Sequence, residues 1–156
     1  MYEEQMTQAL QLQAAVNPQI INNQYVNSGV IDMETTRRAL FILEIGAVTG
    51  GGSITASLQE SAASGSGFAG NGSAGAFSNS GGLNVQMTPL TTANKQYTFE
   101  VRAGQLTAGK RYVRLNVGET GSQNVYVTVV ALGGEGIHKP NNANNDSSVV
   151  TQDVVA

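Results

Sequence analysis

The feature that most constrains the fold of this chain is a series of short segments in which apolar residues occupy every second position. In residues 53–60, for example, Ile54, Ala56 and Leu58 alternate with polar side chains. This period of two puts the apolar side chains on one face of an extended strand, and that face must be buried against a core. Similar segments are residues 25–33, 37–48, 83–87, 96–103, 110–117 and 123–132. About seven short strands separated by turn residues predict an all-β chain, a β-sandwich or jelly-roll-like arrangement of antiparallel sheets.

Residues 37–48 form the most apolar of these segments. One face holds only apolar residues, namely Ala39, Phe41, Leu43 and Ile45. The opposite face adds Leu40 and Ile42, and Glu44 is the only charge inside the apolar run. A nearly continuous apolar run of this kind predicts a central strand that is covered on both sides.

Two turn sequences predict hairpins. Gly-Gly-Gly at 50–52 connects the apolar run to residues 53–60. Glu-Thr-Gly-Ser at 119–122 connects residues 110–117 to the valine-rich residues 123–132. Short connections that contain glycine are typical of hairpins, so we expect the strands on either side of each turn to pair with each other.

The N-terminal residues 1–24 differ from the rest of the chain and predict an arm. Residues 2–16 are rich in helix formers. Asn17 and Pro18 would end such a helix, because a residue before proline avoids the α-helical region. The apolar face of this helix is thin, so we expect a short helical or extended arm that docks on its own domain or on a neighbouring subunit.

The remaining chain divides into a domain and a tail. Residues 25–134 predict one β-sandwich domain, and residues 135–156 form a polar C-terminal tail. Within the domain, residues 61–82 are a loop rich in Gly, Ser and Ala that is far longer than a typical hairpin turn. Phe68 and Phe77 are its only large apolar residues, so we expect them to anchor it.

Composition excludes several classes of function. The chain has no cysteine, which rules out a disulfide scaffold, a thiol nucleophile and every cysteine-based metal site. Charged residues make up 12%, roughly half of the usual ~25%. The net charge is −3 and the eight basic residues are scattered, so no basic patch for nucleic acid is expected. No apolar run approaches the ~20 residues of a membrane span. We expect no enzyme, no cofactor, no nucleic-acid partner and no membrane partner.

Three sets of residues have the chemistry of a site but lack its context. Residues 65–70 and 70–75 both match G-x-G-x-x-G, yet no helix is expected after them to receive a pyrophosphate. His138 follows the last predicted strand, and the chain has no G-x-S-x-G nucleophile motif. The carboxylates are widely spread: Asp32, Glu34, Glu44, Glu60, Glu100, Glu119 and Glu135. We therefore predict no catalytic, cofactor-binding or metal-ligating residue.

Two basic clusters are candidate anion contacts, Arg37 with Arg38 and Lys110 with Arg111 and Arg114. On an alternating strand, Arg111 faces away from Arg114. Solvated charges or intersubunit salt bridges are therefore expected here in preference to a phosphate site.

Several segments together resemble a family of small virion proteins of tailed bacteriophages. The segments that carry the resemblance are residues 27–33, 37–48, 93–96, 100–103, 109–115 and 129–134. The second half of this set includes a Lys-Arg-Tyr-Val-Arg-Leu strand that begins at Lys110. The resemblance covers residues 22–134 apart from the glycine-rich loop, and its motifs are strand patterns without catalytic residues.

The resemblance implies a decoration or cement protein that binds the outer surface of an icosahedral phage capsid and stabilises it through intersubunit contacts. It implies two partners, the major capsid protein and further copies of the chain itself, as a homotrimer in preference to a homodimer. It places the protein in the virion after synthesis in the host cytoplasm.

The alternative is a β-sandwich module of a phage tail or fibre that binds a receptor or glycan. Such a module typically displays aromatic residues on exposed loops. The tyrosines of this chain instead fall in the predicted arm or strands: Tyr2, Tyr25, Tyr97, Tyr112 and Tyr126. Their placement favours a structural use. An enzyme with a jelly-roll fold would need a cluster of ligands around His138.

Overall fold

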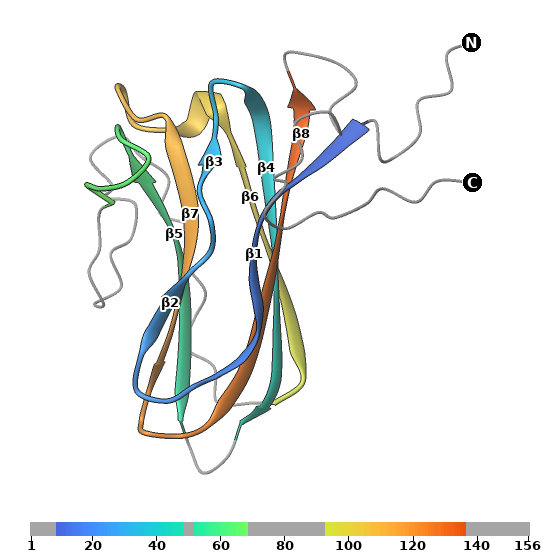
Figure 1. The fold of residues 1–156 in the computed structure, drawn as a ribbon, viewed down its shortest axis with the longest axis vertical. Coiled ribbons are helices and arrows are strands. Elements are labelled where there is room, and N and C mark those ends of the chain that lie inside the picture. Colours follow the sequence, from blue (N-terminus) through green and yellow to red (C-terminus); the bar gives the residue numbers. More distant parts are fainter. Residues whose placement is uncertain (1–8, 49–51, 69–92, 137–156) are drawn as a thin grey trace.

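The computed structural model describes residues 9–48, 52–68 and 93–136. These residues form two antiparallel sheets that face each other (Figure 1), so the predicted all-β sandwich is confirmed. The strands are β1 (Leu10–Ile21), β2 (Tyr25–Asn27), β3 (Ile31–Asp32), β4 (Thr36–Val48), β5 (Ser53–Ser61), β6 (Lys95–Arg102), β7 (Tyr112–Thr120) and β8 (Val125–Gly136). A single 3-10 turn, η1 (Ala103–Gln105), follows β6, and the described part contains no α-helical element.

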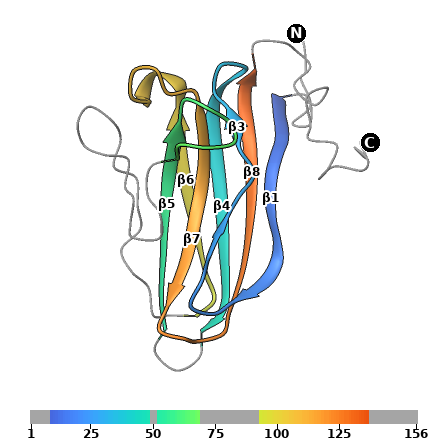
Figure 2. The same ribbon diagram turned by 60° about the vertical axis from the view of Figure 1, so that its left-hand side comes forward.

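The first sheet has the strand order β1-β8-β4-β6. In the second sheet β7 is central, with β5 paired along one edge and β2 and β3 paired with successive parts of the other edge. Figure 2 shows the two sheets side by side with their strands running in nearly the same direction. This alignment is typical of sandwich packing.

Side chains from both sheets meet in one apolar core. The inward face of β4 holds Ala39, Phe41, Leu43 and Ile45, none of them more than 3% exposed. The central strand of the opposite sheet contributes Val113, Leu115 and Val117, all 0% exposed. The period of two therefore predicted both inward faces correctly. Each large aliphatic or aromatic side chain buried in this way stabilises the fold by about 1.5–3 kcal/mol.

Of the two forms predicted for the N-terminal arm, the helix is wrong for residues 10–16 and the extended form is confirmed for Leu10–Ile21. Residues 2–8 of the predicted helix lie outside the described residues. Leu10–Ile21 is a strand that pairs antiparallel with β8. A register irregularity between Val16 and Gln19 lets the strand continue past Pro18. Proline is tolerated there because β1 is an edge strand and the position is irregular. Pairing with β8 outweighs the helical propensity of the local sequence, which is only a weak preference.

Both predicted hairpins are wrong, because each connection crosses from one sheet to the other. β4 pairs with β6 and β8, whereas β5, which follows it, pairs with β7. In the same way β7 belongs to the second sheet and β8 to the first. A turn sequence reverses the chain in either arrangement. Crossing between the sheets lets two consecutive strands point their apolar faces at each other across the core.

A buried carboxylate lies at the lower end of the sandwich in Figure 1, where β7 ends. Glu119 is 0% exposed, and its Oε2 accepts a hydrogen bond from the backbone N–H of Asn23 at 2.6 Å. Its own N–H donates to the carbonyl oxygen of Gln24 at 3.0 Å. Asn23 has a φ of 46°, in the left-handed region. Glu119 therefore fastens the turn between β1 and β2 to the end of β7.

We expect Glu119→Ala to lower the free energy of unfolding by about 1–3 kcal/mol, because the buried N–H of Asn23 loses its acceptor. Urea denaturation followed by circular dichroism measures the effect. Glu100→Ala is the control, since Glu100 is exposed and forms only a surface ion pair, and its loss is expected to cost less than about 1 kcal/mol. Equal losses for the two variants would show that Glu119 has no special role.

The inward face at the upper end is tightly packed around Gly133 of β8. A Cβ on Gly133 would lie 2.8 Å from Nε2 of Gln11 and 2.9 Å from Cγ2 of Thr36. We expect Gly133→Ala to destabilise the protein by about 1–3 kcal/mol through overpacking. Gly134→Ala is the matched control, because its Cβ would lie 3.6 Å from Leu10, an ordinary contact distance. Thermal unfolding that is lowered equally in both variants would contradict this account.

Candidate functional site

Arg111, one of the candidate anion contacts, is paired within the chain. Its Nε donates to Oδ1 of Asp32 at 2.7 Å and its Nη2 donates to Oδ2 of the same carboxylate. Its Nη1 forms an ion pair with Glu34. The backbone N–H of Met33 also donates to the carbonyl oxygen of Arg111 at 2.9 Å. This bidentate pair thus joins the end of β3 to the residue before β7, and Arg111 has its partners within its own chain.

The Asp32–Arg111 pair also sets the protonation of both groups. The hydrogen bond from Arg111 is the main cause that holds the pKa of Asp32 below its ordinary value of 3.8, and partial burial opposes it. The same bond raises the pKa of Arg111. Both groups are therefore charged near neutral pH, and neither is suited to exchange a proton there.

Arg114 has different partners from Arg111. Its Nε donates to Oε1 of Gln59 at 2.8 Å, and its guanidinium carbon lies 4.1 Å from the ring centroid of Phe68. Burial lowers the pKa of Arg114. The expectation that Phe68 anchors the glycine-rich loop is confirmed by this stacking, whereas Phe77 lies outside the described residues. The two arginines therefore do not form a joint anion site.

The other carboxylates do not converge on one place. Glu60 accepts a hydrogen bond from the backbone N–H of Thr107, and Glu44 accepts one from the side chain of Gln96. Glu100 and Glu135 share one partner, because both form ion pairs with Arg38. Within the described ranges, no group of three or more His, Cys, Asp or Glu side chains is placed to hold a metal ion.

The other motif residues lie apart from any such group. Gly65 and Gly67 follow β5 in a turn, and Gly67 has a φ of 70°. The second glycine motif, residues 70–75, and His138 lie outside the described residues. In the part of the chain that the structure describes, no helix is long and apolar enough to cross a membrane.

Among the described residues, two surface hollows lie at opposite ends of the sandwich. One of about 320 Å³ lies at the upper end beside Met33 and Arg111. A larger one of about 520 Å³ lies toward the lower end, where Glu44, Tyr126 and Thr128 line it. The larger hollow is both polar and aromatic, and it opens on the outward side of the first sheet.

The outward side of the first sheet is apolar across three strands. We call this surface the aliphatic face, and it consists of Leu12 of β1, Val130 and Leu132 of β8, and Leu40 and Ile42 of β4. All five side chains are only half-buried. Further along the same side, Ile20 and Tyr126 lie opposite each other and are 44% and 55% exposed.

The aliphatic face corrects one prediction about residues 37–48. β4 is central, between β8 and β6, as expected. Its outward residues Leu40 and Ile42 nevertheless keep exposed surface, and no other described strand lies over them. Coverage on both sides is therefore wrong for the described part of the chain.

The outward side of the second sheet has the opposite character. It holds polar side chains from its two longest strands, namely Thr55, Ser57, Gln59, Arg114 and Asn116. These side chains bind polar neighbours, as where Asn116 donates to Oδ1 of Asn27 at 2.9 Å. Ser57, Gln59 and Asn116 are each no more than 9% exposed, so this side is polar and largely buried. The contrast between the two sheets marks the aliphatic face as the candidate interaction surface.

Sequence reasoning identified part of this surface and missed the rest. Leu40 and Ile42 were recognised as a second apolar face of their strand. Leu12 was assigned to a helix, and Val130 and Leu132 were assigned to no surface. The alternation of Val130 and Leu132 with buried residues of β8 indicates that both face outward. Only the register with β4 shows that they lie beside Ile42 and Leu40 and so belong to the aliphatic face.

We expect Asp32→Asn to lower stability at pH 7, because the carboxylate partner of Arg111 is lost. The pKa of Asp32 is lowered on folding, so its stabilising effect is present above 3.8 and disappears as the pH falls through the folded value. The urea midpoints of the wild type and the variant should therefore approach each other below pH 3.8. A difference that stays constant down to pH 2, or that vanishes above pH 5, would contradict the assignment.

Comparison with known proteins adds no relative. No protein-family model matches this chain, and no curated protein matches it. The resemblance to phage decoration proteins therefore stays a prediction. What the structure contributes is a β-sandwich whose described carboxylates are paired within the chain and whose first sheet presents an apolar outward face.

Proposed function

We propose that this chain is a structural virion protein that decorates the outer surface of an icosahedral bacteriophage capsid. The observation that carries the proposal is the aliphatic face, because an apolar patch that keeps part of its surface accessible on a folded domain is typical of a surface that meets another protein. The resemblance over residues 22–134 supplies the kind of assembly. Its partners are the major capsid protein and other copies of this chain, and its place is the virion, after synthesis in the host cytoplasm.

The scarcity of charge supports this role. Burying an unpaired charge at an interface is costly, so surfaces that spend their life against other subunits are depleted in charge. Only 12% of the residues are charged, and the described ion pairs involve mainly Arg38 and Arg111. The chain acts by binding alone, with neither a cofactor nor a reaction.

Repetition on a symmetric shell explains how modest contacts become a stable attachment. Each copy that binds as part of a symmetric oligomer makes its further contacts effectively intramolecular. The resemblance implies a homotrimer in preference to a two-fold homodimer. In either case a closed symmetric oligomer is the usual form of such an assembly.

A second candidate function is favoured by the hollow of about 520 Å³ beside Tyr126. A ring that is 55% exposed next to carboxylate, amide and hydroxyl groups is the kind of surface that recognises a sugar. This observation supports the receptor- or glycan-binding module of a tail or fibre as the alternative.

The two candidates are separated by locating the full chain on phage particles. Purified chain is added to capsids that lack it, and the mixture is examined by cosedimentation and electron microscopy. We expect saturable binding, regular density on the outer capsid surface, and a higher temperature of capsid disruption.

The other outcomes are equally informative. Density confined to the tail would support the alternative function. A chain that binds neither capsid nor tail would overturn both. Tyr126→Ala serves as an internal comparison, because loss of the exposed ring should weaken glycan binding if the hollow is a sugar site.

A further inference from the structure

We propose that the aliphatic face binds the same face of a second copy of this chain, in a two-fold dimer with the strands of the two copies antiparallel across the interface. This inference rests on the proposed function and deepens it by assigning one surface to self-association. It takes the two-fold dimer in place of the homotrimer that the resemblance implies, because the register of the first sheet is two-fold complementary. It is tested on the purified chain alone, so its failure is distinguishable from a failure to bind capsids.

The register of the first sheet makes the face complementary to itself. Leu12, Leu132 and Leu40 form one row across three strands, and Ala15, Val130 and Ile42 form the next outward row. Consider a two-fold axis that lies between the first sheet of one copy and the first sheet of the other. The axis is parallel to these sheets, perpendicular to their strands, and at the level of Phe41. It places the first row of each copy on the second row of the other. Leucine therefore faces the smaller Ala and Val or the branched Ile, which suits interdigitated packing.

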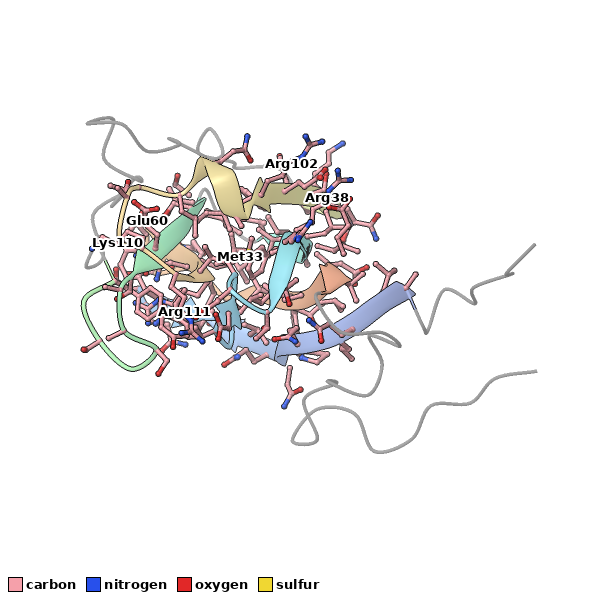
Figure 3. The ribbon with its side chains drawn as sticks, turned by 90° about the horizontal axis from the view of Figure 1, so that it is seen from above. Met33, Arg38, Glu60, Arg102, Lys110 and Arg111 are labelled. Carbon is pink, nitrogen blue, oxygen red and sulfur yellow. The ribbon has the colours of Figure 1, made fainter. Side chains whose placement is uncertain are left out.

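The two ends of the face complement each other under the same rotation. One end carries Arg38 beside Arg102 on the neighbouring strand. Figure 3 shows these two arginines together at the β4–β6 side, away from Lys110 and Arg111. The other end carries Glu44, hydrogen-bonded to Gln96, in the hollow of about 520 Å³. Because residues 38 and 44 are equally distant from Phe41, the arginine end of each copy meets the partner's hollow at Glu44.

The arginine end has two long side chains, Arg38 and Arg102, and the hollow at the opposite end of the partner has the space to accommodate them. Arg38 is 39% exposed although it pairs with Glu100 and Glu135 of its own chain. Arg102 is exposed as well. Lys95 also lines the hollow. Ion pairs at both ends set the register of the two copies, and the aliphatic rows between them supply most of the affinity.

The outward side of the whole first sheet, which contains the aliphatic face, has the size of a stable interface. Its strands lie about 4.8 Å apart; β1, β4 and β8 have twelve or thirteen residues, or ~40 Å at ~3.4 Å per residue, and β6 has eight, or ~27 Å. The resulting area is ~700 Å² for each copy, close to the ~800 Å² per partner of a standard interface. Ile20 and Tyr126, the two most exposed large apolar side chains of this sheet, fall inside that area.

The test begins with the mass of the wild-type chain by light scattering or sedimentation. We expect twice the 16.2 kDa of one chain. Leu40→Glu places a charge in the centre of the proposed interface and should give a monomer. Thr55→Glu is the matched control, because Thr55 is also half-buried and also lies on the outward side of a strand, but in the second sheet. The control should remain a dimer.

A second measurement does not depend on the folding of Leu40→Glu. Since the chain has no cysteine, Leu40→Cys and Ile42→Cys each introduce a unique thiol. The two-fold arrangement puts residue 40 of one copy opposite residue 42 of the other. A short thiol cross-linker should therefore join a mixture of the two variants faster than either variant alone.

Each contrary result overturns the inference. A wild-type monomer would show that this face does not self-associate, and a trimer would exclude the two-fold arrangement. A dimer that survives Leu40→Glu, or that dissociates equally with Thr55→Glu, would place the interface elsewhere. Cross-linking that is no faster in the mixture would refute the antiparallel register. A dimer that fails to bind capsids would leave this inference intact and refute only the proposed function.

Discussion

The structure depends above all on the burial of one apolar face from each sheet in a shared core. β4 and β7 are the central strands of the two sheets, and their inward side chains are excluded from solvent almost completely. This burial decides how the chain is connected. Consecutive strands such as β4 and β5, or β7 and β8, lie in opposite sheets, because this arrangement lets their apolar faces meet. The polar contacts at the two ends, Glu119 below and the Asp32–Arg111 pair above, then hold the connecting turns in place.

The core also explains why the two outward faces can differ in polarity. Both sheets contribute side chains to the same core, so both inward faces are apolar. Their outward faces are free to differ, and they do: the second sheet carries hydrogen-bonded polar side chains, whereas the first carries five half-buried aliphatic ones. A sandwich gains nothing for its own stability from apolar residues that face water. Association with another protein gives these residues a physical reason to be there.

Several features were predictable from sequence because they depend on local periodicity. The strand positions and inward faces of β4, β6 and β7 follow from the alternation of apolar and polar residues. The anchoring role of Phe68 follows from its being a large apolar residue in a loop of small ones. Features that depend on pairing between distant segments were not predictable. Gln11 and Leu12 have the composition of a helix, and only the free edge of β8, more than a hundred residues away, makes them part of a strand.

The sequence by itself determined that this chain forms strands, which side of each strand faces the core, and that its thiol and multi-histidine chemistry is absent. The tertiary structure alone decided which strands are neighbours, that two short turns cross between sheets, and that residues of β1, β8 and β4 form one continuous surface. The physical reason is that alternation is a property of a single segment. Register and sheet membership are set by which arrangement of all the segments buries the most apolar area while satisfying the backbone hydrogen bonds.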